Sequence, residues 1–504
     1  MREVSTAVIK RLDLKNAVEA EAAAWRNLLP REPWTAKAES KSGYFASWVT
    51  TRLTAGDRNA PGWVVDVRKA HQAFRPVPII GVAERVAYRA LTEWVLKDDD
   101  DLPSRSKEAY RDFVLGPIRH ALPGEGPLSL ADATVDYVVH ADIAACYQYI
   151  DHGVLLRELE SRTGKIAEAR LLVELLGEIQ GATYGLPQLL DASDMLSEVY
   201  LQILERAVTR RVGPVWRFND DFRLAVKGYG NAQQALEDLA AAARPLGLVL
   251  NEQKSNIMKF GTYFIRHFAP DFSDEADEGQ VNPAELELWD ETTYPDLEEG
   301  ASIEAALETL ERLEQGATNP IDLKNSTAQD VKDLRWAFTR LTTERAPQGL
   351  DFVAAVFDLV PQLTPRLGDY LVAVHAGGES IAEVWLAIAE ESGTQNAWQR
   401  AWITYVAREC GLTTGPALDW LLAQHQAAPT GLLHAETTLA LAQAGEMSFE
   451  TVDSALRAEP EALTPWYALA LNHVGATDEQ LKAVRGSSAL CRLLVDEPSS
   501  GSGS

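Results

Sequence analysis

The sequence predicts an α+β first half followed by an all-α second half. In the first half, short β-like runs alternate with longer helical patterns. The β-like runs lie at residues 62–67, 77–82, 135–141, 215–217 and 222–226. Strands that mix with helices at uneven spacing indicate an α+β fold rather than a regular βαβ repeat. From about residue 302 onward only helical patterns remain, separated by Gly, Pro, Asn and Thr-Asp signals.

Charge changes at the same boundary. The 504 residues carry a net charge of −27, yet residues 1–269 hold 34 basic and 35 acidic residues. The remainder holds 13 basic and 39 acidic residues. An acidic half repels phosphates, whereas a near-neutral half can still carry a basic groove on one face. Any contact with nucleic acid is therefore expected in the first half.

Composition argues against several classes of protein. No stretch approaches the roughly 20 uninterrupted apolar residues of a membrane span, and residues 1–15 lack the apolar core of a signal peptide. Three cysteines (Cys146, Cys410 and Cys491) lie far apart without CxxC spacing, which argues against a zinc site or a disulfide framework. We therefore expect a cytoplasmic protein without a membrane partner.

The chain is expected to divide into several parts. The helical half has a helix-pair texture that favours an irregular HEAT-like repeat, with a plain helical bundle as the alternative. The last residues, Gly501 to Ser504, are typical of an artificial linker. The expected parts are an N-terminal helical segment (1–70), an α+β core (71–269), an acidic linker (270–300), the helical domain (301–497) and a tail (498–504).

Two places in the core carry carboxylates in a pattern that suits divalent ions. An apolar run ends in Asp142, while Asp220 and Asp221 lie at the bend between two short apolar runs. Nucleotidyl transfer needs two ions about 3.5–4 Å apart, and Mg²⁺ prefers oxygen ligands. A lone aspartate at one strand end, facing a pair on a neighbouring hairpin, supplies that geometry. An isolated Asp-Asp pair is weak evidence in so acidic a chain, and the run Asp98–Asp101 is most simply a solvated loop.

The order of the motifs adds to this signal. Four segments resemble motifs A, B, C and D of reverse transcriptases, in that order, and Arg75 to Ile79 with Glu84 and Arg85 resembles the fingers motif of the bacterial enzymes. The resemblance implies a right-hand palm-and-fingers fold for residues 71–269, joined by the helical segment 1–70. The four segments are 138–152 (VVHADIAACYQYIDH), 184–188 (YGLPQ) with Ser193, 217–222 (RFNDDF) and 247–257 (GLVLNEQKSNI).

The resemblance also implies which residues hold metal. Asp142 and Asp220 would be the principal ligands of Mg²⁺ or Mn²⁺. The backbone carbonyl of Ile143 would complete one ion's ligand set, with Asp221 nearby.

Five further residues would bind the incoming nucleotide. Tyr147 would stack beneath the sugar and exclude a 2′-hydroxyl, with a buried strand-end aromatic as the alternative. Arg75 would bind the triphosphate through bidentate hydrogen bonds, and Pro187 and Gln188 would shape the pocket for nucleotide and template. Lys254 would protonate or neutralise the leaving pyrophosphate, with an ordinary surface lysine as the alternative.

Some positions depart from the family pattern. Leu189 and Leu190 follow Gln188 where most reverse transcriptases have a glycine and then a small residue or proline, which puts template handling in question because glycine permits close backbone approach. Asn219 stands where a small or apolar residue is common. Asp151 and His152 are expected to cap the helix after the first motif.

A reverse-transcriptase core followed by a helical-repeat domain resembles the abortive-infection and unknown-group enzymes of bacterial antiphage defence. That family implies an RNA-directed DNA polymerase that uses dNTPs and forms homo-oligomers. It either extends DNA without a template, in some members from a protein tyrosine, or copies a non-coding RNA. Tyr44, Tyr294 and Tyr370 are open candidates for such a tyrosine. The alternatives are an RNA-templated reverse transcriptase of a mobile element and an inactive palm that serves as a scaffold.

Overall fold

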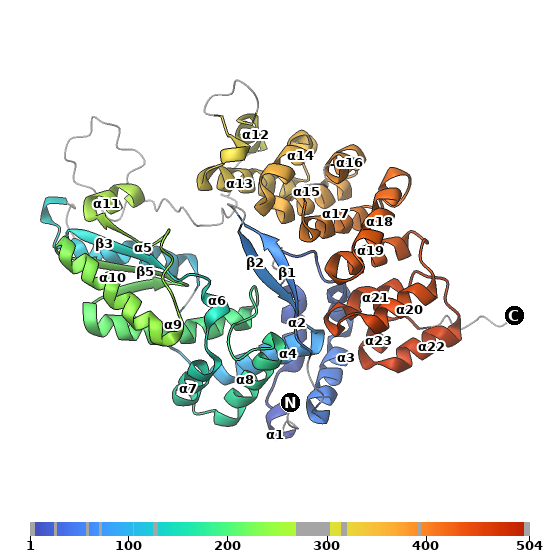
Figure 1. Cartoon of the computed structure of the whole chain (residues 1–504), viewed down its shortest axis with the longest axis horizontal. Coiled ribbons are helices and arrows are strands. Elements are labelled where there is room, and N and C mark those ends of the chain that lie inside the picture. The colour runs from blue at the N-terminus through green and yellow to red at the C-terminus, as the bar shows by residue number, and fades with distance from the viewer. Residues whose placement is uncertain are drawn as a thin grey trace. The chain divides into compact units, whose positions relative to one another are not determined.

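The structure is a computed structural model, and it shows a mixed α+β chain that is largely helical (Figure 1). It divides into two compact units, one of Leu91–Thr293 and one that combines Met1–Ala90 with Tyr294–Ser504. The linker and tail expected at 270–300 and 498–504 lie outside the described residues. Those residues are 6–24, 28–56, 60–69, 73–103, 105–123, 130–268, 303–313, 320–390 and 395–497.

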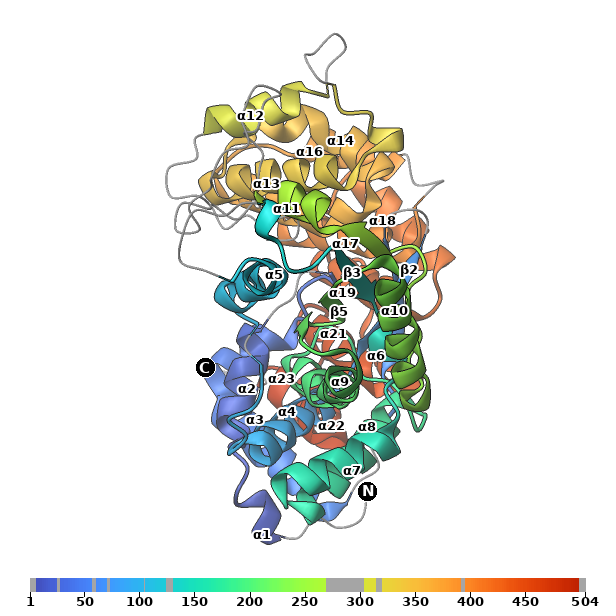
Figure 2. The same cartoon turned by 90° about the vertical axis from the view of Figure 1, so that its left-hand side faces the viewer.

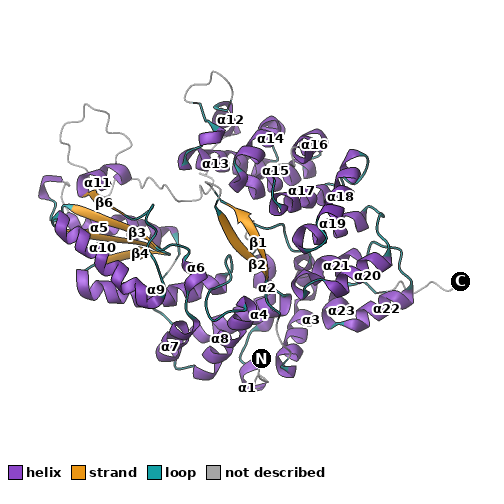
Figure 3. Ribbon diagram, in the orientation of Figure 1, coloured by secondary structure: helices purple, strands orange, loops and turns teal. Residues whose placement is uncertain are grey.

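The unit Leu91–Thr293 is built on a four-stranded antiparallel sheet, drawn in orange in Figure 3. The strands follow the order β4 (Val215–Phe218), β5 (Asp221–Val226), β3 (Tyr137–Asp142) and β6 (Asn256–Lys259). The strands expected at 135–141, 215–217 and 222–226 are therefore confirmed, whereas β6 was not predicted.

Helices cover both faces of this sheet. Figure 2 shows α5 (Lys107–Ala121) and α10 (Tyr229–Ala243) on opposite sides of β3 and β5. Val138 of β3 and Ala225 of β5 share one buried core with α5 and with α11 (Phe260–Phe268). Because side chains alternate along a strand, Val139 points to the other face, where α10 packs together with α9. The remaining helices of this unit are α6 (Cys146–Tyr149), α7 (His152–Thr163), α8 (Ile166–Gln180) and α9 (Asp191–Val212).

The second unit contains the helical half, where alternate helices pack against each other in two rows. One row consists of α13, α15, α17, α19, α21 and α23, and the other includes α14, α16 and α18. The HEAT-like assignment stays a prediction. The bounds are α12 (Ile303–Glu311), α13 (Ala328–Glu344), α14 (Leu350–Leu359), α15 (Thr364–Ala376), α16 (Ala382–Glu390), α17 (Ala397–Glu409), α18 (Pro416–Ala427), α19 (Gly431–Gln443), α20 (Phe449–Ala458), α21 (Thr464–Ala470), α22 (Asp478–Ser487) and α23 (Ala489–Leu494).

The N-terminal segment packs on these helices within the same unit. Helix α3 contacts α23, the hairpin of β1 and β2 contacts α17 through β1, and the indole of Trp402 donates to the carbonyl of Leu28 at 3.1 Å. Arg52 joins Glu84 at 2.7 Å and also pairs with Glu461. The segment comprises α1 (Thr6–Ile9), α2 (Leu14–Ala23), α3 (Trp34–Ala55), β1 (Trp63–Arg68), β2 (Phe74–Ile79) and the start of α4 (Val82–Leu96).

Two further points follow from these helices. The Glu84-Arg85 pair lies in the first turn of α4, where Arg85 binds Glu21 of α2 at 2.5 Å and Glu32 at 2.6 Å and so ties α4 to the N-terminal segment. Within the described ranges, no helix combines the length and the apolar character needed to cross a membrane.

Candidate active site

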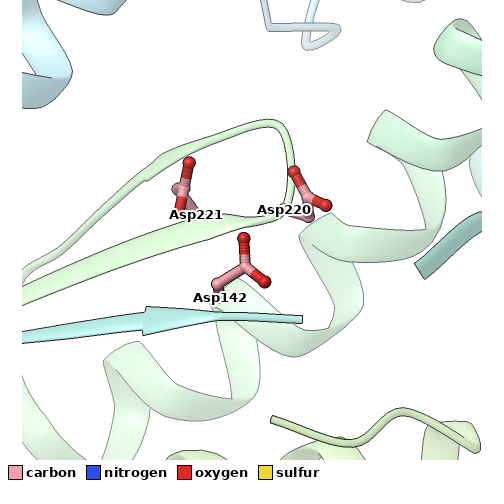
Figure 4. A group of neighbouring side chains, drawn as sticks. All are labelled: Asp142, Asp220 and Asp221. Atoms are coloured by element: carbon pink, nitrogen blue, oxygen red, sulfur yellow. The ribbon is translucent and has the colours of Figure 1, made fainter. Parts of the chain in front are cut away.

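The three aspartates meet at one end of the four-stranded sheet (Figure 4). Asp142 is the last residue of β3 and lies directly opposite Asp221, the first residue of β5. Residues paired across antiparallel strands share a face, and Asp220 adjoins them from the turn between β4 and β5. One carboxylate oxygen of each lies within 4.8 Å of the others. The fold therefore brings together the three aspartates that the sequence predicts to lie close to one another.

The turn that presents Asp220 is a two-residue connection with a constrained backbone. Phe218 pairs with Asp221, so only Asn219 and Asp220 lie between the strands. Asn219 has a φ of +51°, in the left-handed region that asparagine tolerates better than most residues. The amide of Ile143 donates to the carbonyl of Asp220 at 3.1 Å and ties the turn to β3. The unusual asparagine therefore suits the conformation of the turn.

Crowding of like charges makes this site unfavourable without a cation. Asp142 is only 4 % exposed. Burial, followed by the charges of Asp142 and Asp221, raises the pKa of Asp220 to about 6. Three hard oxygen donors within 4.8 Å of one another fit Mg²⁺ or Mn²⁺, because a divalent ion would offset the cost of holding the charge of Asp220 beside Asp142 and Asp221.

Two side chains from the segment after α10 hold Asp142. The ammonium of Lys254 lies 2.9 Å from one carboxylate oxygen, and the amide of Asn251 donates to the other at 2.9 Å. The backbone amide of Asn251 also donates to the carbonyl of Asp142 at 2.7 Å. Partial burial disfavours the charged form of Lys254, yet its hydrogen bond to Asp142 and that residue's charge raise the pKa of Lys254. Lys254 thus lies in the site, and Asn251 is a site residue that the sequence analysis did not single out.

Tyr147 is held by its hydroxyl group. The hydroxyl donates to Asp194 at 2.6 Å and accepts from Arg105 at 3.2 Å and from Ser197 at 3.3 Å. Burial raises the pKa of Tyr147, so the hydroxyl stays protonated. Its role as a barrier to the 2′-hydroxyl stays a prediction. Arg105 was not predicted, because nothing in its local sequence marks it.

The segment with Pro187 and Gln188 lies against α6. The amide of Leu186 donates to the carbonyl of Tyr147 at 2.7 Å. Pro187 is buried and Gln188 half-buried, and their roles in the nucleotide pocket stay predictions. Leu189, which follows Gln188, has a φ of +67°, so a leucine occupies a left-handed conformation that usually favours glycine.

The helix cap after the first motif is confirmed for Asp151 only. Its carboxylate accepts from the amide of Val154 at 2.8 Å. The expectation for His152 was wrong, because that side chain is buried and its Nε2 donates to the carbonyl of Gly185 at 2.7 Å. Ala145, just before α6, has a φ of +47°.

Other candidate residues lie in the unit that does not contain the aspartates. Arg75 lies on β2, and its contact with a triphosphate stays a prediction. Tyr44 is 72 % exposed and lies within α3, whereas Tyr370 is fully buried and donates to the carbonyl of Ala346 at 2.7 Å. A buried, hydrogen-bonded Tyr370 does not suit a priming hydroxyl, and Tyr294 lies outside the described residues.

Comparison with known proteins finds distant structural likeness to telomerases. No family model and no curated protein matches the sequence. The Candida tropicalis telomerase in complex with the TWJ fragment of telomeric RNA is 11% identical, with a TM-score of 0.32, over 72% of this chain and 66% of that chain. The apo enzyme of the same organism is 12% identical, with a TM-score of 0.33, over 76% and 74%. The Candida albicans telomerase with the same kind of RNA fragment is 11% identical, with a TM-score of 0.31, over 82% and 66%. This chain thus spans between 66% and 74% of the telomerase chains it matches.

Proposed function

We propose that this protein is a nucleotidyltransferase of the reverse-transcriptase type that adds deoxynucleotides to DNA. The observation that carries this proposal is the cluster of Asp142, Asp220 and Asp221, whose oxygens lie within 4.8 Å of one another at one end of the central strands of an antiparallel sheet. The motif order in the sequence supports it independently. A general cation site would explain the cluster but not the surrounding motifs.

In this mechanism Asp142 and Asp220 would hold Mg²⁺ or Mn²⁺, and Asp221 and the backbone carbonyl of Ile143 would supply further ligands. When bound, the ions stabilise the attacking and leaving oxygens of an in-line displacement. A bond forms between the 3′-oxygen of the growing strand and the α-phosphorus of the dNTP, while the bond from that phosphorus to pyrophosphate breaks and the 3′-hydroxyl releases its proton to solvent. Lys254 is cationic and lies 2.9 Å from Asp142, so it would lie near the reacting phosphates and could neutralise the departing pyrophosphate.

The nucleotide-binding roles complete the proposal. Tyr147 would select against a 2′-hydroxyl, and its ring is already fixed by the hydrogen bonds to its hydroxyl. Pro187 and Gln188 would line the pocket from the segment beside α6, and Arg75 would bind the triphosphate.

We further propose that the enzyme acts in antiphage defence in the cytoplasm as a homo-oligomer. The motif resemblance and the acidic helical half that follows the α+β core support this placement. Synthesis would proceed without a template or on a non-coding RNA, and a protein tyrosine is a candidate primer. The leucines at 189 and 190 favour unusual template handling, since the family's glycine is absent.

The experiment that tests the activity is synthesis by the purified protein. It is incubated with single dNTPs and Mg²⁺ or Mn²⁺, without template, and the products are resolved by denaturing electrophoresis. DNA growth that disappears in Asp220→Ala, but not in the exposed control Asp132→Ala, supports the proposal. Product that stays attached to the protein after denaturation supports priming from a tyrosine.

Two other outcomes separate the alternatives. Growth only when RNA and a primer are added favours a templated reverse transcriptase of a mobile element. No product in any mixture, with folded protein, contradicts the proposed activity and favours a scaffold.

A further inference from the structure

Helix α9 presents a buried polar face to the candidate active site. Asp194, Ser197 and Glu198 lie within about one turn of one another, and Glu205 follows seven residues after Glu198, which places them along one side of the helix. Ser197 is fully buried and Glu198 is 3 % exposed. Buried polar side chains need partners, and those of α9 find them on the two segments that carry Asp142 and Asp220.

The first of these segments is the turn that bears Asp220. Arg217 of β4 donates to Glu198 at 2.7 Å and to Glu205 at 2.9 Å. The same guanidinium donates to the carbonyl of Asn219 at 3.0 Å, and the Arg217 side chain is 2 % exposed. Asn219 immediately precedes Asp220, so the hydrogen bond from Arg217 to the Asn219 carbonyl holds the left-handed backbone that positions the Asp220 side chain.

The second segment follows Asp142. Arg105 donates to Glu198 at 2.8 Å and to the hydroxyl of Tyr147 at 3.2 Å, and it lies 3.0 Å from Asp194. Tyr147 belongs to α6, the short helix that begins four residues after Asp142. Arg105 and α9 together therefore hold the chain as it leaves β3.

Glu198 joins the two segments. One of its carboxylate oxygens binds Arg105 and the other binds Arg217. Two guanidiniums that share one carboxylate have little freedom, because displacing either one breaks hydrogen bonds to Glu198, which is only 3 % exposed.

We infer that Glu198, Arg105 and Arg217 are positioning residues that set the separation of Asp142 and Asp220, and thereby the affinity of the site for divalent cations. The inference deepens the proposed function and rests on it. None of the three needs to touch an ion, since outer residues that orient ligands commonly change metal affinity by roughly 10- to 100-fold when replaced.

The test compares two substitutions whose direct electrostatic effects have opposite signs. Glu198→Gln removes a negative charge and Arg217→Gln removes a positive one. Through space alone, the first would weaken cation binding and the second would strengthen it. If the network acts by positioning, both variants bind more weakly, because both release the Asn219-Asp220 turn.

Binding is measured with Mn²⁺, whose free ion gives an electron paramagnetic resonance signal that falls on binding. We expect the dissociation constant to rise roughly tenfold in Glu198→Gln and in Arg217→Gln. Unchanged or tighter binding by Arg217→Gln overturns the inference. No Mn²⁺ binding by the unaltered protein overturns the proposed function instead, so the two failures are distinguishable.

Two controls address folding and nonspecific loss of charge. Glu158→Gln breaks the 2.7 Å pair between α7 and Arg206 of α9, which touches neither aspartate segment, and is expected to leave the affinity unchanged. Thermal melting shows whether each variant folds. Each arginine that remains after either substitution keeps a carboxylate partner. If Arg217→Gln does not fold, Arg217→Lys replaces it, because lysine keeps the charge but lacks the guanidinium geometry. Weaker binding by Arg217→Lys supports the inference, and unchanged binding overturns it.

Discussion

The carboxylate of Asp220 should make the metal-free protein less stable, so that Asp220→Asn stabilises the fold while it abolishes catalysis. Burial and the neighbouring Asp142 and Asp221 raise the pKa of Asp220 from 3.8 to about 6. The folded state therefore binds more protons than the unfolded state between these values. Stability falls as the pH rises through this window and stays lower above pH 6.

The size of this effect follows from the same shift. A rise from 3.8 to about 6 corresponds to about 3 kcal/mol once Asp220 is ionised. Because the side chain keeps some contact with solvent, that figure is an upper bound. Asparagine has nearly the same shape and no charge, so the variant should gain about 1 to 3 kcal/mol at pH 7.5. At pH 4.5, where the folded carboxyl is largely protonated, the gain should fall to about 1 kcal/mol or less.

The assay is urea unfolding in EDTA, followed by tryptophan fluorescence at low protein concentration. The unaltered protein, Asp220→Asn and Asp221→Asn are compared at both pH values. The Asp221 side chain is 34% exposed, so its variant should gain less. In excess Mn²⁺ the order should reverse, because only the unaltered site binds the ion well, and ligand at about 1,000 times its dissociation constant adds about 4.1 kcal/mol.

Two results would refute this reasoning. One is an Asp220→Asn variant that is no more stable than the unaltered protein at pH 7.5 in EDTA. The other is a gain of the same size at both pH values, which would trace the change to packing instead of charge.

Three further substitutions test individual contacts. Lys254→Met should lower dNTP incorporation roughly 10- to 100-fold in single-turnover kinetics without weakening Mn²⁺ binding, and loss of both would place Lys254 among the structural residues. Asn251→Ala removes the hydrogen bond that orients one carboxylate oxygen of Asp142, so it should weaken Mn²⁺ binding roughly tenfold in the resonance titration; unchanged affinity would show that this hydrogen bond is dispensable. Tyr147→Ala should raise the ribonucleotide-to-deoxynucleotide incorporation ratio at least about tenfold, and a constant ratio would remove Tyr147 from sugar selection.

Local patterns in the sequence were enough to locate the carboxylates. The apolar run before Asp142 and the runs on both sides of Asp220 and Asp221 predict β3, β4 and β5, and the register of those strands brings the aspartates together. Alternation along strands is a local property, so it is readable without the fold. Strand β6 has only four residues and exposed polar ends at Asn256 and Lys259, so it offers little pattern.

Pairings between distant residues were not readable in this way. Arg105 and Glu198 are 93 residues apart in the sequence, and no local pattern around either residue predicts their contact. The run Asp98–Asp101 was expected to be solvated, yet the Asp99 side chain is 7 % exposed and binds Arg162. Helix α5 contains Gly116 and Pro117, two residues that usually interrupt a helical pattern. A side chain at Gly116 would collide with the ring of Trp216, which accounts for the glycine.

Backbone conformation at the candidate site has a consequence for the protein's tolerance of mutation. Ala145, Leu189 and Asn219 are three of the four non-glycine residues at positive φ in the described chain, and each adjoins a segment of the site. Replacing a residue by glycine usually lowers stability, but at a left-handed position it removes a strain of roughly 1 kcal/mol. In a survey of all single substitutions, glycine should therefore be accepted at Ala145 and Leu189 more readily than at neighbouring positions. Natural drift toward glycine there would then cost the fold little, leaving these positions open to change while the aspartates beside them stay fixed.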